Sequence, residues 1–226
     1  MPMTSEPFDR QKHVYTNHDF LELVKDAVRF FNGTPVHPLP PPESFSGTGV
    51  YAIYYTGSNS LYKKYRQLNR LSYSYPIYVG KAVPKGWRQS RVADAQGSQS
   101  SELWSRINQH GRSIEVVSNL RLSDFWCRFM ICEHVASEMI STVEAALIKW
   151  NRPLWNTRLD GFGNHDPGKG RYEQAKSDWD VIHPGRTFAD KCKGMTTPMP
   201  AIIAMIEQEL SLLGSGREAD DRLANP

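Results

Sequence analysis

The chain has 226 residues, with 27 Lys and Arg against 24 Asp and Glu, and a net charge of +3 at pH 7. This length suits one domain with extensions, or at most two small domains, and is enough to bury a core. No apolar run approaches the roughly 18 residues of a membrane span, and no signal peptide is evident, so we expect a cytoplasmic protein without a membrane partner. The 3 cysteines form no CxxC pair, which argues for a reduced protein without a disulfide framework or zinc site.

An amphipathic helix is predicted near the N-terminus. Asn17 can cap it, Asn32-Gly33 can end it, and apolar residues recur between them with helical spacing. We expect this apolar stripe to lie on the core or at a subunit interface. Residues 35–42 are rich in proline and predict a stiff, extended linker. The stripe consists of Phe20, Leu23, Val24, Ala27, Val28 and Phe31.

Three segments are predicted to be strands. Residues 50–55 and 77–79 are rich in β-branched and aromatic side chains, and residues 124–133 alternate between apolar and polar ones. The first two segments carry Tyr51 and Tyr78, each in a motif with a glycine where the backbone or a ligand can approach closely.

Positive charge is concentrated in one window of the chain. Residues 57–93 contain eight Lys or Arg and no Asp or Glu, so the remainder carries a net charge of −5. Aromatic residues are interleaved with these cations, a combination that suits a polyanion, most simply nucleic acid. A solvated loop is the alternative, and composition does not decide between them. The window holds Lys63, Lys64, Arg66, Arg70, Lys81, Lys85, Arg88 and Arg91, with Tyr62, Tyr65, Tyr73, Tyr75 and Trp87 among them.

Further helices are predicted at residues 101–110, 136–151 and 200–213. On the first of these helices, Arg106 and His110 are one turn apart and project together.

Glu144 stands out on the helix predicted at residues 136–151, because it lies inside an apolar stripe. A carboxylate on a core-facing stripe is costly unless it is paired or binds a metal ion. The alternatives are that Glu144 lies at the edge of the stripe or pairs with an arginine.

In chain order, four motifs resemble those of the GIY-YIG nuclease superfamily: Gly49-Val50-Tyr51, Tyr78–Ala82, Leu103–His110 and Glu144–Asn156. The resemblance implies an α+β fold with a small three-stranded antiparallel sheet flanked by helices, here extended by inserts and by N- and C-terminal helical segments. It also implies hydrolysis of a DNA phosphodiester with one divalent metal ion per site, normally Mg²⁺, for which Mn²⁺ can substitute.

Three residues receive roles from this resemblance by their positions in the motifs. Glu144 corresponds to the glutamate that binds the metal ion, which would explain a carboxylate in an apolar stripe. Arg106 corresponds to the arginine that contacts the scissile phosphate. Asn156 corresponds to a terminal asparagine that fixes the geometry of the site.

The two motif tyrosines, Tyr51 and Tyr78, correspond to those that order or activate the attacking water. We expect Tyr51 to be the general base, which requires a cation such as the metal ion or Lys81, or an imidazole, to lower its pKa. His110 stands where many relatives have a tyrosine. It can relay a proton or bind the phosphate; the alternative is that it only preserves a hydrogen bond.

The expected organisation has three parts. Residues 1–46 form an N-terminal arm and helix that wrap the partner subunit or the DNA. Residues 47–160 form the nuclease core, with DNA-binding inserts at residues 57–75 and 83–100. Residues 161–226 form a C-terminal extension that ends in a disordered tail after its helix.

This organisation most resembles type II restriction endonucleases, in particular the subgroup that cuts CCGCGG (isoschizomers of SacII). The resemblance implies a bacterial enzyme whose cognate DNA methyltransferase acts on the same site. A homodimer is expected, because two strands of a palindrome need two sites and a two-fold protein matches a two-fold sequence. The alternatives are a repair or homing nuclease, and a DNA-binding module that has lost catalysis. For base contacts the candidates are Arg66, Arg70, Arg88 and Arg91, and for the DNA backbone Lys63, Lys64 and Lys85.

Overall fold

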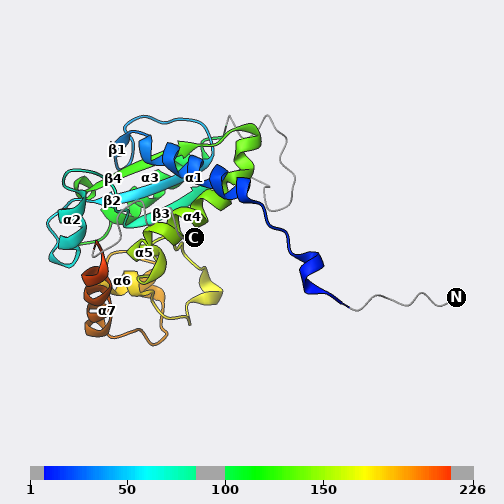
Figure 1. Cartoon of the computed structure of the whole chain (residues 1–226). Coiled ribbons are helices and arrows are strands. Elements are labelled where there is room, and N and C mark those ends of the chain that lie inside the picture. Colours follow the sequence, from blue (N-terminus) through cyan, green and yellow to red (C-terminus); the bar gives the residue numbers. More distant parts are fainter. Residues whose placement is uncertain (1–7, 85–99, 215–226) are drawn as a thin grey trace.

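The computed structural model describes residues 8–84 and 100–214 (Figure 1). Its centre is a four-stranded sheet with the strand order β1-β4-β2-β3, in which all neighbours are antiparallel. The strands are β1 (Val36–Pro38), β2 (Gly49–Tyr55), β3 (Tyr78–Ala82) and β4 (Phe125–Ile131).

The predicted α+β class is confirmed, but the sheet has one strand more than expected. The additional strand, β1, comes from the segment predicted to be a linker, and it pairs with β4 through Val36–Arg128, His37–Cys127 and Pro38–Trp126. A proline is tolerated here because β1 is an edge strand, where a missing N–H breaks no ladder on the outer side.

Helices cover both faces of the sheet. On one face, α1 and α4 pack against the β2 side chains Val50, Ala52 and Tyr54. On the other face, α3, α5, α6 and α7 enclose Tyr51, Ile53 and Tyr55. This division follows from the alternation of side chains along a strand. The helices are α1 (His18–Gly33), α2 (Lys63–Asn69), α3 (Glu102–Glu115), α4 (Ile140–Asn151), α5 (Leu154–Thr157), α6 (Asp178–Ile182) and α7 (Met199–Leu212).

Short 3-10 helices connect these elements: η1 (Arg10–His13), η2 (Ser60–Tyr62), η4 (Leu122–Asp124), η5 (His134–Met139), η6 (Lys169–Arg171) and η7 (Ala189–Lys191). No helix in the described ranges is both long enough and apolar enough to cross a membrane.

The N-terminal helix begins as predicted, because the Asn17 side chain accepts from the N–H groups of Asp19 and Phe20 at 2.8 and 3.4 Å. Only part of its apolar stripe is buried. Val24, Val28 and Phe31 pack on the core, whereas Phe20 and Leu23 are each 51% exposed. One edge of the stripe therefore faces solvent.

Two predicted helix boundaries were wrong. Helix α3 continues past His110 to Glu115, and Gly111 and Ile114 in this additional turn are buried. Helix α4 begins at Ile140, and the residues predicted as its first turn form the 3-10 helix η5.

The first insert is folded on the core and is not a loose loop. Tyr62 and Tyr65 are buried, and the Tyr62 hydroxyl lies 2.6 Å from Nε2 of His183. Asn69 bonds the backbone of Tyr55 and Tyr75. The expectation that Tyr62 and Tyr65 accompany the cations on a nucleic-acid surface was therefore wrong, because both rings are core.

Arg186 ties the C-terminal segment together. Its side chain is 3% exposed and binds both carboxylate oxygens of Asp180, at 2.6 and 2.7 Å. Its remaining donors reach the carbonyl oxygens of Gly161, Phe162 and Asn164 at 2.7 to 3.2 Å. All five guanidinium hydrogens are thereby used. The Arg186 guanidinium thus fixes the irregular backbone of residues 161–164 to α6.

We expect Asp180→Asn to lower the free energy of unfolding by roughly 3–5 kcal/mol, because it leaves a buried guanidinium without its counter-charge. Urea unfolding followed by tryptophan fluorescence measures this loss. Glu173→Gln is the matched control, since it removes an exposed pair with Lys193 and should leave stability unchanged. Equal stability of Asp180→Asn and wild type would contradict the assignment of Arg186 as a structural clamp.

Candidate active site

Gly80 determines where the Tyr51 side chain lies. The two residues are opposite each other in the β2–β3 ladder. A Cβ atom at Gly80 would lie 2.4 Å from the Tyr51 hydroxyl, a distance that no real contact has. Only glycine therefore allows the Tyr51 ring to lie over β3, the edge strand of the sheet.

Tyr51 meets Tyr78 and His110 on this face. The Tyr51 hydroxyl lies 2.7 Å from Nε2 of His110. The His110 ring centroid is 5.5 Å from that of Tyr51 and 5.0 Å from that of Tyr78. Helix α3 brings His110 to the tyrosines, so the structure unites three of the residues that the sequence nominated.

Burial keeps this cluster uncharged. It lowers the pKa of His110 to about 3, with the positive charge of Arg106 acting in the same direction. Burial also raises the pKa of Tyr51 well above its usual value; the nearby Tyr78 adds to this and Arg106 opposes it. At neutral pH the imidazole is therefore neutral and can accept a hydrogen bond from the Tyr51 hydroxyl.

Glu144 projects from α4, which packs on β3 from the other face of the sheet. One of its carboxylate oxygens lies 2.7 Å from Nζ of Lys81, and its side chain is 18% exposed. The negative charge of Glu144 contributes to raising the pKa of both Tyr51 and Tyr78, so the carboxylate lies close to the tyrosines. Its partner is thus a lysine of β3 and not an arginine.

The edge of β3 is completed by Asn156, a residue of α5. Its side-chain oxygen accepts from the N–H of Val79 at 2.7 Å, and its side-chain nitrogen donates to the carbonyl of Val79 at 2.8 Å. The amide thereby replaces the neighbouring strand that an edge lacks. Asn156 holds the backbone between Tyr78 and Gly80 in place.

Arg106 lies half-buried on α3, with its Nη1 atom between two side chains. Nη1 donates to Oε1 of Gln109 at 3.1 Å and lies 2.6 Å from Nε2 of His165. The charge of Arg106 opposes the effect of burial on the pKa of Tyr51 and of Tyr78. The arginine therefore belongs to the same electrostatic cluster as the tyrosines.

Sequence reasoning missed two residues that lie in this cluster, Phe162 and His165. The Phe162 ring stacks on His110 with centroids 4.6 Å apart. Both residues lie in a glycine-rich segment without helical or strand pattern, so periodicity could not reveal them. The available signal was an apolar ring between two glycines, followed by a histidine.

The predicted DNA-binding residues divide into two groups. Lys63, Lys64, Arg66 and Arg70 lie on or directly after α2, at the Tyr55 end of β2 and outside the cluster around Tyr51 (Figure 1). Their side chains are exposed, except that of Lys64, which is half-buried. Lys85, Arg88 and Arg91 are outside the described residues.

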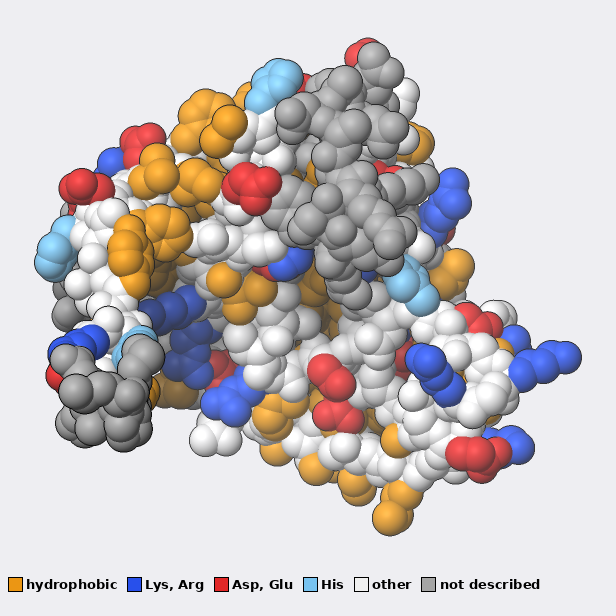
Figure 2. All heavy atoms as spheres, turned by 90° about the vertical axis from the view of Figure 1, so that its right-hand side faces the viewer, with side chains coloured by type: hydrophobic (Ala, Val, Ile, Leu, Met, Phe, Trp, Pro, Cys, Tyr) orange, Lys and Arg blue, Asp and Glu red, His pale blue; other side chains and the backbone are white. Residues whose placement is uncertain are grey.

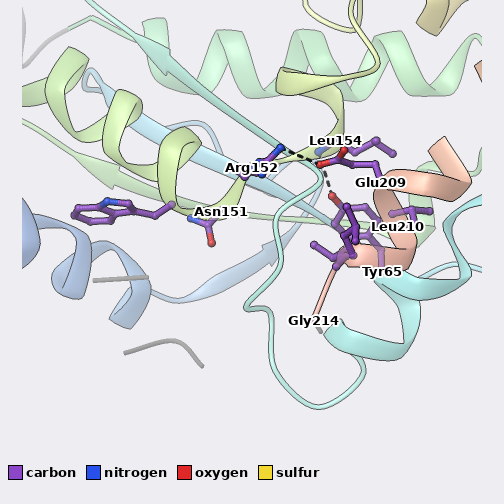
Figure 3. A pocket seen from close by; sticks show the side chains of 10 residues that line it. Tyr65, Asn151, Arg152, Leu154, Glu209, Leu210 and Gly214 are labelled. Atoms are coloured by element: carbon purple, nitrogen blue, oxygen red, sulfur yellow. Dashed lines mark hydrogen bonds and ion pairs between the residues drawn. The ribbon is translucent and has the colours of Figure 1, made fainter. Parts of the chain in front are cut away.

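A pocket of 290 Å³ lies away from this cluster, between the end of α4 and α7 (Figure 3). Glu209 in this pocket pairs with Arg152 at 3.4 Å and with Arg158 at 2.9 Å. Its lining includes none of the nominated site residues. The candidate active site is therefore the cluster at the edge of β3 and not this hollow.

The donor set at the site suits Mg²⁺ better than a metal that needs several protein ligands. In the described ranges, no three His, Cys, Asp or Glu side chains come together as a metal-binding group. Mg²⁺ keeps several of its waters and is often bound through one or two carboxylates together with substrate phosphates. Glu144, close to Arg106 and the tyrosines, meets that requirement.

A family model described as the Eco29kI GIY-YIG domain matches residues 43–210. The match spans most of the chain, from before β2 to α7, and so includes the Phe162 segment as well as the motif residues. The chain belongs to this family of GIY-YIG restriction endonucleases. It is a nuclease that acts on DNA. The search of curated proteins found no match.

We expect Gly80→Ala to lower the rate of DNA cleavage by about 100-fold, because an added methyl group would displace the Tyr51 hydroxyl by an ångström or more. Gly170→Ala is the matched control, since its new methyl group would meet no atom within 4 Å. Cleavage rates of both purified variants, alongside their melting temperatures, give the comparison. Full activity in Gly80→Ala would show that the packing of Tyr51 over β3 is not required.

We expect the protein to lose stability on acidification from pH 6.5 towards pH 4. The pKa values of His110 and His183 are both lowered to about 3 by burial, whereas in the unfolded chain they titrate near 6.5. Between these values the unfolded chain binds more protons, so stability falls as pH falls, by up to about 1.4 kcal/mol per pH unit for each histidine. Urea unfolding at several pH values measures the slope, and NMR titration of the two imidazoles with midpoints near 6.5 would contradict it.

Proposed function

We propose that this restriction endonuclease is a type II enzyme that cuts both strands of a palindromic, GC-rich double-stranded DNA site, with CCGCGG as the specific candidate. The observation that carries the proposal is the convergence of Tyr51, Tyr78, Arg106, His110 and Glu144 on one edge strand. These residues supply a phosphate-binding cation, a carboxylate for a divalent ion and a hydroxyl–imidazole pair, which are the groups that phosphodiester hydrolysis requires.

In the proposed reaction, Glu144 would hold one Mg²⁺, for which Mn²⁺ can substitute. When bound, the ion would neutralise charge on the phosphate and make water a better nucleophile. Lys81, at 2.7 Å from Glu144, pairs with the carboxylate and orients it. Arg106 contacts the scissile phosphate and stabilises the charge that develops on it.

Proton transfer is assigned to Tyr51 and His110, with Tyr78 ordering the attacking water. Tyr51 takes the proton of the water as its own proton passes over the 2.7 Å to Nε2 of His110. The neutral imidazole is in the form required to accept it. A bound phosphate brings negative charge that offsets Arg106, which raises the pKa of His110 and makes it a better acceptor. Asn156 keeps β3, and with it Tyr78, in register.

DNA recognition is assigned to the basic side chains of the two inserts within the core at residues 47–160. Arg66, Arg70, Arg88 and Arg91 are the candidates for guanine edges in the major groove. Lys63, Lys64 and Lys85 are assigned to phosphates. Residues 161–226 remain a C-terminal extension in this proposal.

A homodimer is the proposed assembly, with the N-terminal arm at residues 1–46 wrapping the partner or the DNA. Exposed apolar side chains of α1 support this part, since Phe20, Leu23 and Phe30 are 51%, 51% and 63% exposed. In Figure 2, hydrophobic side chains gather at the upper left of the face, with acidic side chains among them, and again along its lower edge. A methyltransferase acting on the same sequence would protect the host DNA.

We expect Glu144→Ala to lower Mg²⁺-dependent plasmid cleavage by roughly a thousandfold, because loss of the carboxylate removes several kcal/mol of charge stabilisation. DNA binding, measured by gel shift, should persist, since the contacts are assigned to the inserts. Glu207→Ala, an exposed glutamate of α7, is the matched control.

Sequencing the ends of the digested plasmid reports the site and the stagger together. Discrete fragments with one terminal sequence support restriction at a specific site. A ladder of unrelated ends would favour a repair or homing nuclease. Binding without cleavage by the wild type would overturn catalysis altogether.

A further inference from the structure

The segment at residues 161–165 forms an additional wall of the active site. Phe162 packs on His110 and on Tyr78, with ring centroids 4.6 and 5.0 Å apart. A Cβ atom at Gly163 would lie only 3.0 Å from the Tyr78 hydroxyl, so the backbone passes directly beside that oxygen. His165 follows and reaches Arg106. One short segment therefore touches three of the nominated site residues.

This wall is held rigidly from behind by Arg186. Its bonds to the carbonyls of Gly161, Phe162 and Asn164 fix the three residues that precede His165. The Cζ atom of Arg186 lies over the rings of Trp179 and Phe188, at 4.5 and 4.9 Å from their centroids. His165 is thus placed by a buried, fully bonded support, although its own side chain is exposed.

The contact between His165 and Arg106 has a definite polarity. Arginine only donates, so Nε2 of His165 must be the acceptor at 2.6 Å, and the imidazole must be neutral. Together with Gln109, this bond uses both hydrogens of Nη1. The hydrogens on Nε and Nη2 are then left for other acceptors, such as a phosphate. The two bonds to Nη1, from His165 and Gln109, therefore restrict the orientation of the guanidinium.

We propose that neutral His165 is a positioning residue that orients Arg106 towards the scissile phosphate. The inference rests on the proposed function in one respect, namely that Arg106 binds that phosphate. His165 acts through Arg106 and is not assigned a contact with DNA.

The charges around His165 favour its neutral form. Burial, followed by the charges of Arg106 and Arg186, lowers its pKa. His110 faces it as a neutral imidazole. The neighbouring carboxylate of Asp166 is engaged elsewhere, by the N–H of Gly168 and the hydroxyl of Tyr172, with Lys191 at 3.8 Å. Protonation of His165 would remove the acceptor and place a second cation beside Arg106, so activity should fall as pH falls through the pKa of His165.

The test compares four variants in single-turnover and steady-state cleavage: His165→Ala, His165→Gln, Arg106→Ala and the double variant. His165→Ala should lower kcat by about 10- to 100-fold with KM within threefold of wild type, because the arginine is misplaced and not lost. His165→Gln keeps an acceptor that does not titrate, so it should retain most activity and lose part of the decline in kcat at acid pH. In the Arg106→Ala background, His165→Ala should have no further effect.

Met195→Ala, which changes a side chain that is 95% exposed and lies outside the wall at residues 161–165, is the control and should behave as wild type. Wild-type kcat in His165→Ala, equal losses in the Ala and Gln variants, or additive losses in the double variant would each overturn the proposal.

A readout without catalysis separates this proposal from the proposed function. NMR titration should show that the pKa of His165 rises when Arg106 is replaced by alanine, because one of the charges that lower it is removed. An unchanged pKa overturns the His165–Arg106 contact even if the enzyme cuts DNA. A raised pKa in a protein that cuts no DNA supports the contact and overturns only the proposed function.

Discussion

The absent side chain at Gly80 is the constraint on which the site depends. Because β3 is an edge strand, a ring that crosses it reaches the border between the two faces of the sheet. Tyr51 can cross only where the opposing residue has no Cβ. On that border the α3 residues, from one face, come close to Glu144, from the other. Asn156 then bonds the N–H and the carbonyl of Val79 on the outer side of β3, so this edge cannot pair with another strand there.

The irregular chain after α5 also reaches this edge, where Phe162 packs on Tyr78 and His110. Arg186 holds this glycine-rich segment in place. All five guanidinium donors are satisfied, and three of their acceptors are carbonyl groups of the segment. The family match extends through this segment, in agreement with its place in the folded domain. The boundary predicted at residue 160 remains a prediction, but the contacts of Phe162 and His165 cross it.

The sequence revealed those features that leave a local signal. Runs of β-branched and aromatic residues with glycine–tyrosine motifs located β2 and β3, and alternation located β4. A carboxylate in an apolar stripe drew attention to Glu144. Strand β1 was not predicted, because three paired residues in a proline-rich segment are too few to show the alternation typical of a strand. The contacts of His165 and Arg186 were not predicted for a different reason. Their partners lie 59 and 6 residues away across irregular backbone, where no spacing rule connects them. Contacts of that kind follow from the assembled fold alone.

The electrostatics of the free protein are opposite to what the proposed chemistry needs. Burial keeps Tyr51 protonated and His110 a weak base, and Arg106 weakens His110 further. Both histidines that contact this region, His110 and His165, are therefore neutral acceptors before DNA arrives. A phosphate placed against Arg106 would reverse the balance, because its charge offsets the arginine and favours a proton on His110. On this reasoning, His110 becomes an effective proton acceptor only when the substrate phosphate is bound. Until then, neutral His165 holds Arg106 in the orientation that binds the phosphate.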